Sequence, residues 1–126
     1  MSDKKDNILI IGAGLCGSLL ALRLAQRGYT VNVYEGRPDL RTTDISAGRS
    51  INLALSDRGL KAMRLAGVEN KVKPLCIPMY GRLIHDVEGN TFPSNYSGRD
   101  DEYINSISRG ALNGLLLTEA DAYDNL

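Results

Sequence analysis

The apolar positions of the chain begin as an unbroken run and continue as a helical pattern. Residues 8–11 are an uninterrupted run of Ile and Leu, which is typical of a strand covered on both faces. From Leu15 onwards Leu and Ala recur at helical spacing, which predicts a mostly buried helix that ends at Gly28. Residues 30–34 predict a second strand, which closes on Glu35. This order favours a parallel βαβ unit.

The remaining apolar stripes predict shorter elements. A strand-like run at 48–56 precedes a helix that Ser56 or Asp57 would cap, and Ser108 would cap a second helix that ends near Ala120. The apolar stripes of the two helices are expected in the core: Leu60, Met63 and Leu65, then Leu112, Leu115 and Leu116. Strands are expected at 79–87, 91–93 and 103–108, a turn at 88–90, loops at 41–48 and 94–102, and a connection between Pro74 and Pro78.

These elements predict an α/β fold built on a Rossmann-like βαβ unit with additional strands and helices. A doubly wound sheet needs more parallel strands than the two or three that the pattern offers. Residues 121–126 predict no further element. We therefore expect the chain to be an incomplete part of a larger protein.

Three glycines join the first strand to the first helix with the spacing G-x-G-x-x-G. Gly12 would make the tight turn, Gly14 would let the backbone approach a pyrophosphate, and Gly17 would let the helix pack on the strand. The free N–H groups and the positive dipole end of the helix would face the phosphates, and Glu35 stands where a carboxylate binds ribose hydroxyls. The pattern predicts an adenine-dinucleotide site. Glycines that serve only a tight turn are the disfavoured alternative, because the whole strand–helix–strand context is present.

Composition and charge limit the kinds of binding partner that the sequence favours. The 126 residues suit one domain, and the 15 basic residues balance 15 acidic ones, so the charge does not favour a nucleic acid or an anionic membrane. No apolar stretch has the length of a membrane span or of a signal core, which makes a cytoplasmic location the expectation. Cys16 and Cys76 lack metal-ligand spacing, and we interpret Cys16 as a small residue within the motif rather than a reactive thiol. With His85 the single histidine, neither a catalytic residue nor a metal site is predicted.

The motif, with Ala21, Gly28 and the sequence Glu-Gly-Arg at 35–37, resembles the FAD-binding start of the flavoprotein aromatic hydroxylases. Three later stretches resemble, more specifically, the kynurenine 3-monooxygenase family: GRSINLALSDRG at 48–59, PMYGRLIHD at 78–86 and INSISR at 104–109. Their order and spacing also fit, so the resemblance covers the chain from Asn7 to about Leu117. Enzymes of this family use FAD, NADPH and dioxygen to hydroxylate the ring of L-kynurenine at its 3-position.

The resemblance implies cofactor contacts in two parts of the chain. The residues expected to bind the pyrophosphate and adenosine of FAD are Gly12, Gly14, Leu15, Cys16, Gly17, Glu35, Gly36 and Arg37. Leu53 and Ala54 would lie near the flavin, and Arg109 matches an arginine that contacts FAD. For Arg37 the alternative is a solvated surface charge.

The resemblance also implies two substrate contacts. Arg82 matches the arginine that binds the substrate carboxylate, and Tyr96 matches a tyrosine that binds the amino-acid end of kynurenine. A planar guanidinium binds a carboxylate through two parallel hydrogen bonds, which supports the first assignment. The alternatives are a salt bridge between Arg82 and Asp86, and an exposed loop position for Tyr96.

The chain also departs from the family's pattern. The Gly-Asp motif near the flavin ribityl chain, the acidic-glycine motif shared by FAD and NADPH, most of the substrate pocket and the C-terminal helices have no counterpart. We therefore expect residues 1–126 to be the N-terminal part of the FAD-binding domain of a two-domain flavoprotein. Alone, it is expected to be inactive, to hold FAD weakly and to be prone to self-association. The rival hypotheses are an NAD-dependent dehydrogenase domain and a non-catalytic dinucleotide-binding module.

Overall fold

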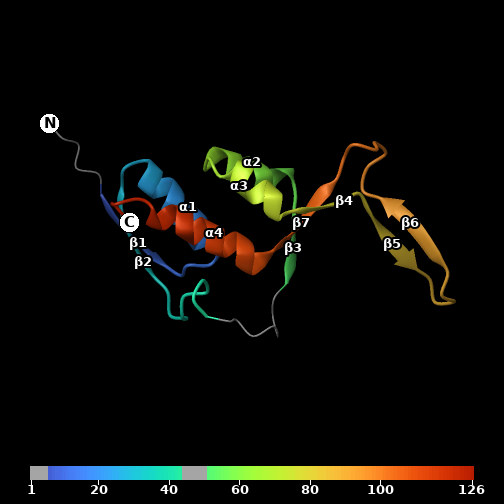
Figure 1. Cartoon of the computed structure of the whole chain (residues 1–126), viewed down its shortest axis with the longest axis horizontal. Helices are drawn as coiled ribbons and strands as arrows, with labels where there is room; N and C mark the ends of the chain where they lie inside the picture. The colour runs from blue at the N-terminus through green and yellow to red at the C-terminus, as the bar shows by residue number, and fades with distance from the viewer. Residues whose placement is uncertain (1–5, 44–50) are drawn as a thin grey trace.

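The structure is a computed structural model that describes residues 6–43 and 51–126. Its elements follow in this order: β1 (Asn7–Ile11), α1 (Leu15–Gln26), β2 (Thr30–Tyr34), β3 (Asn52–Leu55), α2 (Asp57–Leu65), α3 (Glu69–Val72), the 3₁₀ turn η2 (Lys73–Leu75), β4 (Ile77–Met79), β5 (Gly81–His85), β6 (Thr91–Asn95), β7 (Ile104–Ser108) and α4 (Arg109–Asp121). Figure 1 shows β1 and β2 at one end and the β5–β6 hairpin at the other. Most of the predicted loop at 41–48 and the start of the run at 48–56 lie outside the described residues.

The first three elements form the predicted βαβ unit. β1 and β2 pair in parallel, with Ile8 opposite Val31 and Ile10 opposite Val33. The helix between them ends just before Gly28, whose φ of 83° lies in the left-handed region that glycine adopts without steric cost. The Rossmann-like start of the chain is therefore confirmed.

The residues that the structure describes cover one face of the β1–β2 pair and leave the other open. Ile10 and Val31 are buried against Ala21 of α1. Leu9 and Ile11 point to the opposite face and are 62% and 77% exposed. The expectation of a strand covered on both faces is wrong for this chain, because side chains alternate along a strand and the connecting helix lies over one face only.

α1 packs along α4, and this contact joins the βαβ unit to the last helix (Figure 1). Leu22 of α1 and Leu116 of α4 are almost fully buried in the shared core. The predicted cap of α4 is confirmed, since the Ser108 hydroxyl accepts the N–H of Ala111 at 3.3 Å. Leu115 of α4, which was expected in the core, is only partly buried. Leu20 of α1 is exposed, so α1 is buried on one face rather than mostly buried.

A second sheet places β7 between β3 and β4, with both pairings antiparallel. Ile107 of β7 and Met63 of α2 are buried in the same core as Leu116. Leu65 was expected in that core but is 62% exposed, because it ends α2 and Ala66 occupies the buried position. The sequence pattern missed α3 and η2, and it treated part of β4 as a connection.

β5 and β6 form a two-stranded antiparallel hairpin that extends from the rest of the molecule (Figure 1). Its predicted turn at 88–90 is present, with Gly89 at a φ of 89° and the Asp86 carboxylate accepting the N–H groups of Glu88 and Asn90. Apolar side chains on both faces are exposed, among them Leu83 and Phe92.

The segment after α4 forms no helix or strand, as expected, but it does pack on the βαβ unit. The Asn125 side-chain amide donates to the carbonyls of Ala25 and Tyr29, at 3.0 and 2.6 Å. Its backbone carbonyl accepts the N–H of Val31 at 2.8 Å. Asn125 therefore fixes the turn from α1 into β2.

Candidate functional site

The loop between β1 and α1 has the geometry that the glycine spacing predicts. Gly12 has a φ of 101°, which a residue with a side chain rarely adopts. A Cβ on Gly17 would lie 1.9 Å from the backbone oxygen of Gly12, so the helix approaches the loop too closely for any other residue. A Cβ on Gly14 would meet nothing within 4 Å. The backbone at Gly14 therefore borders open space that a ligand could fill.

The N-terminus of α1 faces this open space without a cap of its own. Gly14 is the N-cap residue, no side chain among the described residues caps the helix, and the first turn carries no acidic residue. A helix start leaves N–H groups without partners and carries a partial positive charge. The exposed Cys16 lies in this first turn, next to Leu15. The arrangement suits an anion such as a pyrophosphate.

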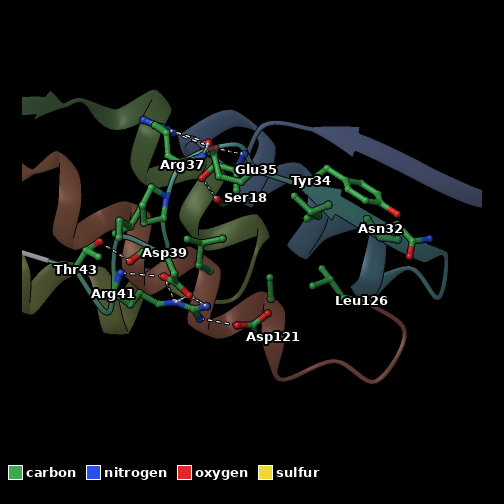
Figure 2. Close-up of a pocket in the computed structure, with 18 residues that line it drawn as sticks. Ser18, Asn32, Tyr34, Glu35, Arg37, Asp39, Arg41, Thr43, Asp121 and Leu126 are labelled. Atoms are coloured by element: carbon green, nitrogen blue, oxygen red, sulfur yellow. Dashed lines mark hydrogen bonds and ion pairs between the residues drawn. The ribbon is translucent and has the colours of Figure 1, made fainter. Parts of the chain in front are cut away.

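Glu35 lies beside the loop and contacts it directly (Figure 2). One carboxylate oxygen accepts the N–H of Ala13 at 2.9 Å, across 22 positions of sequence. Arg37 donates its own backbone N–H at 2.9 Å and two guanidinium N–H groups at 2.9 and 3.1 Å. These hydrogen bonds from Arg37, followed by the one from Ala13, lower the pKa of Glu35 from 4.5 to about 2. Glu35 is therefore ionised at neutral pH, as a ribose-binding carboxylate must be.

Arg37 is paired with Glu35 rather than solvated alone, although its side chain is 72% exposed. It stands at the start of a segment, residues 37–43, that folds back over the end of α4. Arg41 holds this segment in place through ion pairs with Asp39 and Asp121, both at 2.6 Å (Figure 2). The predicted contact of Arg37 with a dinucleotide stays a prediction.

A cavity of about 810 Å³ begins at Glu35 and runs beside β2 (Figure 2). Its walls are β2, segment 37–43, the end of α4 with Leu126, and Ala13 with Ser18 and Ala21 on the side of α1. The cavity thus lies next to the carboxylate that the sequence predicts to bind ribose.

Two buried polar side chains form hydrogen bonds to the loop between β1 and α1, and the sequence analysis missed both. Ser18 of α1 is 0% exposed and Asn113 of α4 is 5% exposed. The Ser18 hydroxyl donates to the Ala13 carbonyl at 3.0 Å, and the Asn113 amide donates to the same carbonyl at 3.0 Å. The sequence signal for each was a polar residue within an apolar helix face. That these two residues, 95 positions apart, contact each other is visible only in the structure.

The residues expected near the flavin lie on β3 and at the start of α4. Leu53 and Ala54 of β3 pair with β7, Leu53 opposite Ile107. Arg109 is the first residue of α4, four positions before Asn113. Residues four apart share one face of a helix, so Arg109 lies about one turn from a side chain that contacts the glycine loop. This placement is compatible with a cofactor contact by Arg109 and leaves the contact a prediction.

Arg82 lies on β5 of the β5–β6 hairpin, at the other end of the molecule from β1 and β2 (Figure 1). Tyr96 directly follows β6 and is exposed, as the alternative of an exposed loop position has it. Arg82 pairs with Ser94, and the N–H of Tyr96 donates to the carbonyl of Tyr80 at 3.0 Å, which extends the ladder. Positions two apart on a strand share a face, so Arg82 and Tyr96 lie on the same face of the hairpin. The alternative salt bridge to Asp86 is not formed, since that carboxylate binds Asn90 and the turn instead.

The described part of the chain offers little support for a metal site, a membrane-spanning helix or a reactive thiol. Across residues 6–43 and 51–126, no group of three His, Cys, Asp or Glu side chains could hold a metal ion. No helix of the same part is both long and apolar enough to cross a membrane. Cys76 is a partly buried free thiol whose burial raises its pKa, which disfavours the reactive thiolate.

Residues 10–76 match the family described as the NAD(P)-binding Rossmann-like domain. This match spans more than half of the chain, so the chain belongs to that family of dinucleotide-binding domains.

Its relatives among curated proteins include kynurenine 3-monooxygenases. The protein of that name from Myxococcus xanthus is 49% identical over 119 residues, and the one from Anopheles gambiae is 45% identical over 126 residues. These alignments cover 94% and 100% of this chain but 26% of each relative. The resemblance found in the sequence is confirmed, and the chain spans about a quarter of the length of these relatives.

Solved structures show the same fold at low sequence identity. The tetrameric form of 2-methyl-3-hydroxypyridine-5-carboxylic acid oxygenase superposes with a TM-score of 0.73 at 21% identity, over 94% of this chain and 30% of that one. The p-nitrophenol 4-monooxygenase of Pseudomonas putida gives a TM-score of 0.72 at 15% identity, over 96% of this chain and 29% of that one. The likeness supports the α/β fold as part of a larger protein.

Proposed function

We propose that this chain binds the adenosine and pyrophosphate half of FAD, as the N-terminal part of an FAD-binding domain. The observation that carries the proposal is the convergence of three features: open space at Gly14, an uncapped helix start, and an ionised Glu35 beside the same loop. Together they provide N–H donors for a pyrophosphate and a carboxylate for a ribose. The residues present thus fit the adenosine half of the cofactor.

Ribose binding would require Arg37 to move. The carboxylate of Glu35 accepts four hydrogen bonds, two from backbone N–H groups and two from the Arg37 guanidinium. A carboxylate has about four lone-pair sites, so ribose hydroxyls would have to replace the guanidinium. Arg37 is largely exposed and can swing away, which would free it to lie along the adenosine half.

For the whole protein we propose an FAD-dependent monooxygenase that uses NADPH and dioxygen to hydroxylate L-kynurenine to 3-hydroxykynurenine. Relatives named kynurenine 3-monooxygenase, at 43–51% identity, support this activity. The bound flavin would supply the redox chemistry, and the residues of this chain would bind and orient the reactants. No side chain of the chain need act as a nucleophile.

Arg82 and Tyr96 would bind the amino-acid end of the substrate. Their shared face on the hairpin supports this role, because both could reach one carboxylate from neighbouring rungs. Arg82 is exposed on the hairpin and forms no ion pair with Asp86. Its two parallel N–H groups are therefore available for a carboxylate.

The rival functions make different predictions about redox chemistry. An NAD-dependent dehydrogenase is compatible with Glu35 and with the family described as NAD(P)-binding, whereas a non-catalytic module would bind a dinucleotide without any turnover. The curated relatives favour the monooxygenase over both. The predicted cytoplasmic location stays a prediction.

The experiment that tests the proposal uses two proteins. Titration of the 126-residue chain with ADP-ribose, which carries the adenosine and pyrophosphate common to FAD and NAD, tests the dinucleotide site. The complete natural protein, if its gene encodes a longer one, should be yellow and oxidise NADPH faster when L-kynurenine is added. A colourless protein that reduces NAD would support the dehydrogenase, and ADP-ribose binding without any redox activity would support the module.

Self-association of the chain is a separate proposal. The apolar residues Leu9 and Ile11 form an uncovered sheet face, which favours contact with a second copy. Light scattering over a range of concentrations would show a rising mass. A constant monomer mass would contradict it.

A further inference from the structure

The carbonyl of Ala13, within the glycine motif, points toward two buried side chains, one on α1 and one on α4. Ser18 and Asn113 both donate to it at 3.0 Å, and both side chains are buried. The Ser18 hydroxyl also lies 3.2 Å from the amide oxygen of Asn113, and its single proton is shared between that oxygen and the Ala13 carbonyl, so the two side chains form one small network. This network joins the loop to α1 and α4 at a single backbone atom.

The orientation of that carbonyl determines the orientation of the next N–H group. The peptide bonds of the described residues are trans, so the N–H of Gly14 points opposite to the carbonyl of Ala13. Because Ser18 and Asn113 bind the carbonyl, the Gly14 N–H points away from these two buried side chains. The N–H of Ala13 is held separately by Glu35. Both peptide planes that flank Ala13 are therefore fixed by side chains from outside the loop.

We propose that Asn113 and Ser18 are positioning residues that aim the Gly14 N–H at the pyrophosphate of the bound dinucleotide. The proposal rests on the proposed dinucleotide site and adds two residues that act through the backbone. Neither side chain needs to touch the ligand. Their effect is to prevent the Ala13–Gly14 peptide from rotating.

The cost of burying these groups supports a positioning role. Asn113 is the one polar residue among the buried positions of α4, which are otherwise Leu112, Leu116 and Ala120. A buried amide costs free energy unless it is hydrogen-bonded, so Leu would serve packing alone at least as well. Without the two donors, the buried Ala13 carbonyl would lose its partners. The peptide could then turn its oxygen toward the phosphate side, where it would repel the ligand.

Three variants of the 126-residue chain test this inference: Ser18→Ala, Asn113→Ala and the double variant. ADP-ribose affinity, measured by isothermal titration calorimetry, should fall about fivefold for each single variant, as for the loss of one ordinary hydrogen bond. The ADP-ribose affinity of the double variant should fall further than that of either single variant. The hydrogen-exchange rate of the Gly14 amide, measured by NMR without ligand, should also change in the variants. A purely structural role would leave the exchange of the Gly14 amide unaffected relative to neighbouring loop amides.

Ile107→Val is the matched control, because it removes one buried methyl group from the core without contacting Ala13. It should lower the melting temperature and leave ADP-ribose affinity unchanged. If Asn113→Ala does not fold, Ser18→Ala, which removes a single oxygen atom, carries the test. Failure of the unsubstituted chain to bind ADP-ribose would refute the proposed function. Binding by the unsubstituted chain and equal binding by both single variants would refute the positioning role alone.

Discussion

Gly14 and Gly17 stand three positions apart in one motif, and the structure predicts opposite consequences for the same substitution. A Cβ on Gly17 would lie 1.9 Å from the Gly12 oxygen, whereas real Cβ contacts are essentially never shorter than 3.0 Å. The atom that it meets is backbone, so either β1 or α1 must move. A Cβ on Gly14 meets nothing within 4 Å, and its φ of −71° and ψ of −173° suit alanine.

Gly17→Ala should therefore damage the fold, and Gly14→Ala should damage binding. We expect Gly17→Ala to cost about 3 kcal/mol or more, as forced overpacking does, and to lower the melting temperature by on the order of 10 °C. Gly14→Ala should change stability by less than about 0.5 kcal/mol. Its methyl group would occupy the space of the pyrophosphate, so ADP-ribose affinity should fall at least about tenfold.

Thermal unfolding followed by circular dichroism and titration calorimetry with ADP-ribose measure the two effects separately. Gly98→Ala is the control, because its Cβ also meets nothing within 4 Å and lies outside the site. It should match the unsubstituted chain in both assays. The reasoning is refuted if Gly14→Ala binds ADP-ribose normally, or if Gly17→Ala melts at the temperature of the unsubstituted chain.

Three further predictions follow from individual contacts. Because the folded pKa of Glu35 is lowered from 4.5 to about 2, its stabilisation is complete above pH 4.5 and is lost as the pH falls toward 2. The difference in melting temperature between the unsubstituted chain and Glu35→Gln should shrink over that range, and a constant difference would contradict the assignment. In the complete enzyme, Arg82→Met should raise the KM for L-kynurenine about tenfold and Arg82→Lys should restore part of the loss, whereas an unchanged KM would remove Arg82 from the substrate site. Ser108→Ala should cost about 1 kcal/mol in chemical denaturation, whereas Ser56→Ala, whose hydroxyl caps nothing, should cost nearly nothing. Equal losses for the two serines would contradict the capping difference.

Local patterns in the sequence were sufficient for most of the elements. The βαβ unit, the Ser108 cap and the turn at 88–90 are encoded by neighbouring residues, through glycine conformations, side-chain capping and apolar spacing. The position of Glu35 beside the glycine loop also follows from sequence, since parallel strands bring their carboxyl ends to one edge. The same patterns failed at Leu65 and at η2, because a short apolar stripe does not specify which turn of a helix meets the core.

Contacts between distant segments were decided by tertiary structure alone. Asn113 reaches Ala13 across 100 positions, and Asn125 reaches Ala25 across 100 positions. The partners of both asparagines are backbone carbonyls, which every residue has. A carbonyl leaves no signature in a sequence. Hydrogen bonds of this kind therefore become visible only when the helices are packed.

The sequence by itself determined that this chain forms a dinucleotide-type βαβ unit and which glycines and carboxylate belong to it. The tertiary structure decided how the loop is held, which face of the β1–β2 pair is covered, and that Arg82 and Tyr96 share one face of a hairpin. The physical reason is the range of the forces involved. Backbone conformation and helix capping act over a few residues, whereas burial and side-chain hydrogen bonds depend on which distant elements come into contact.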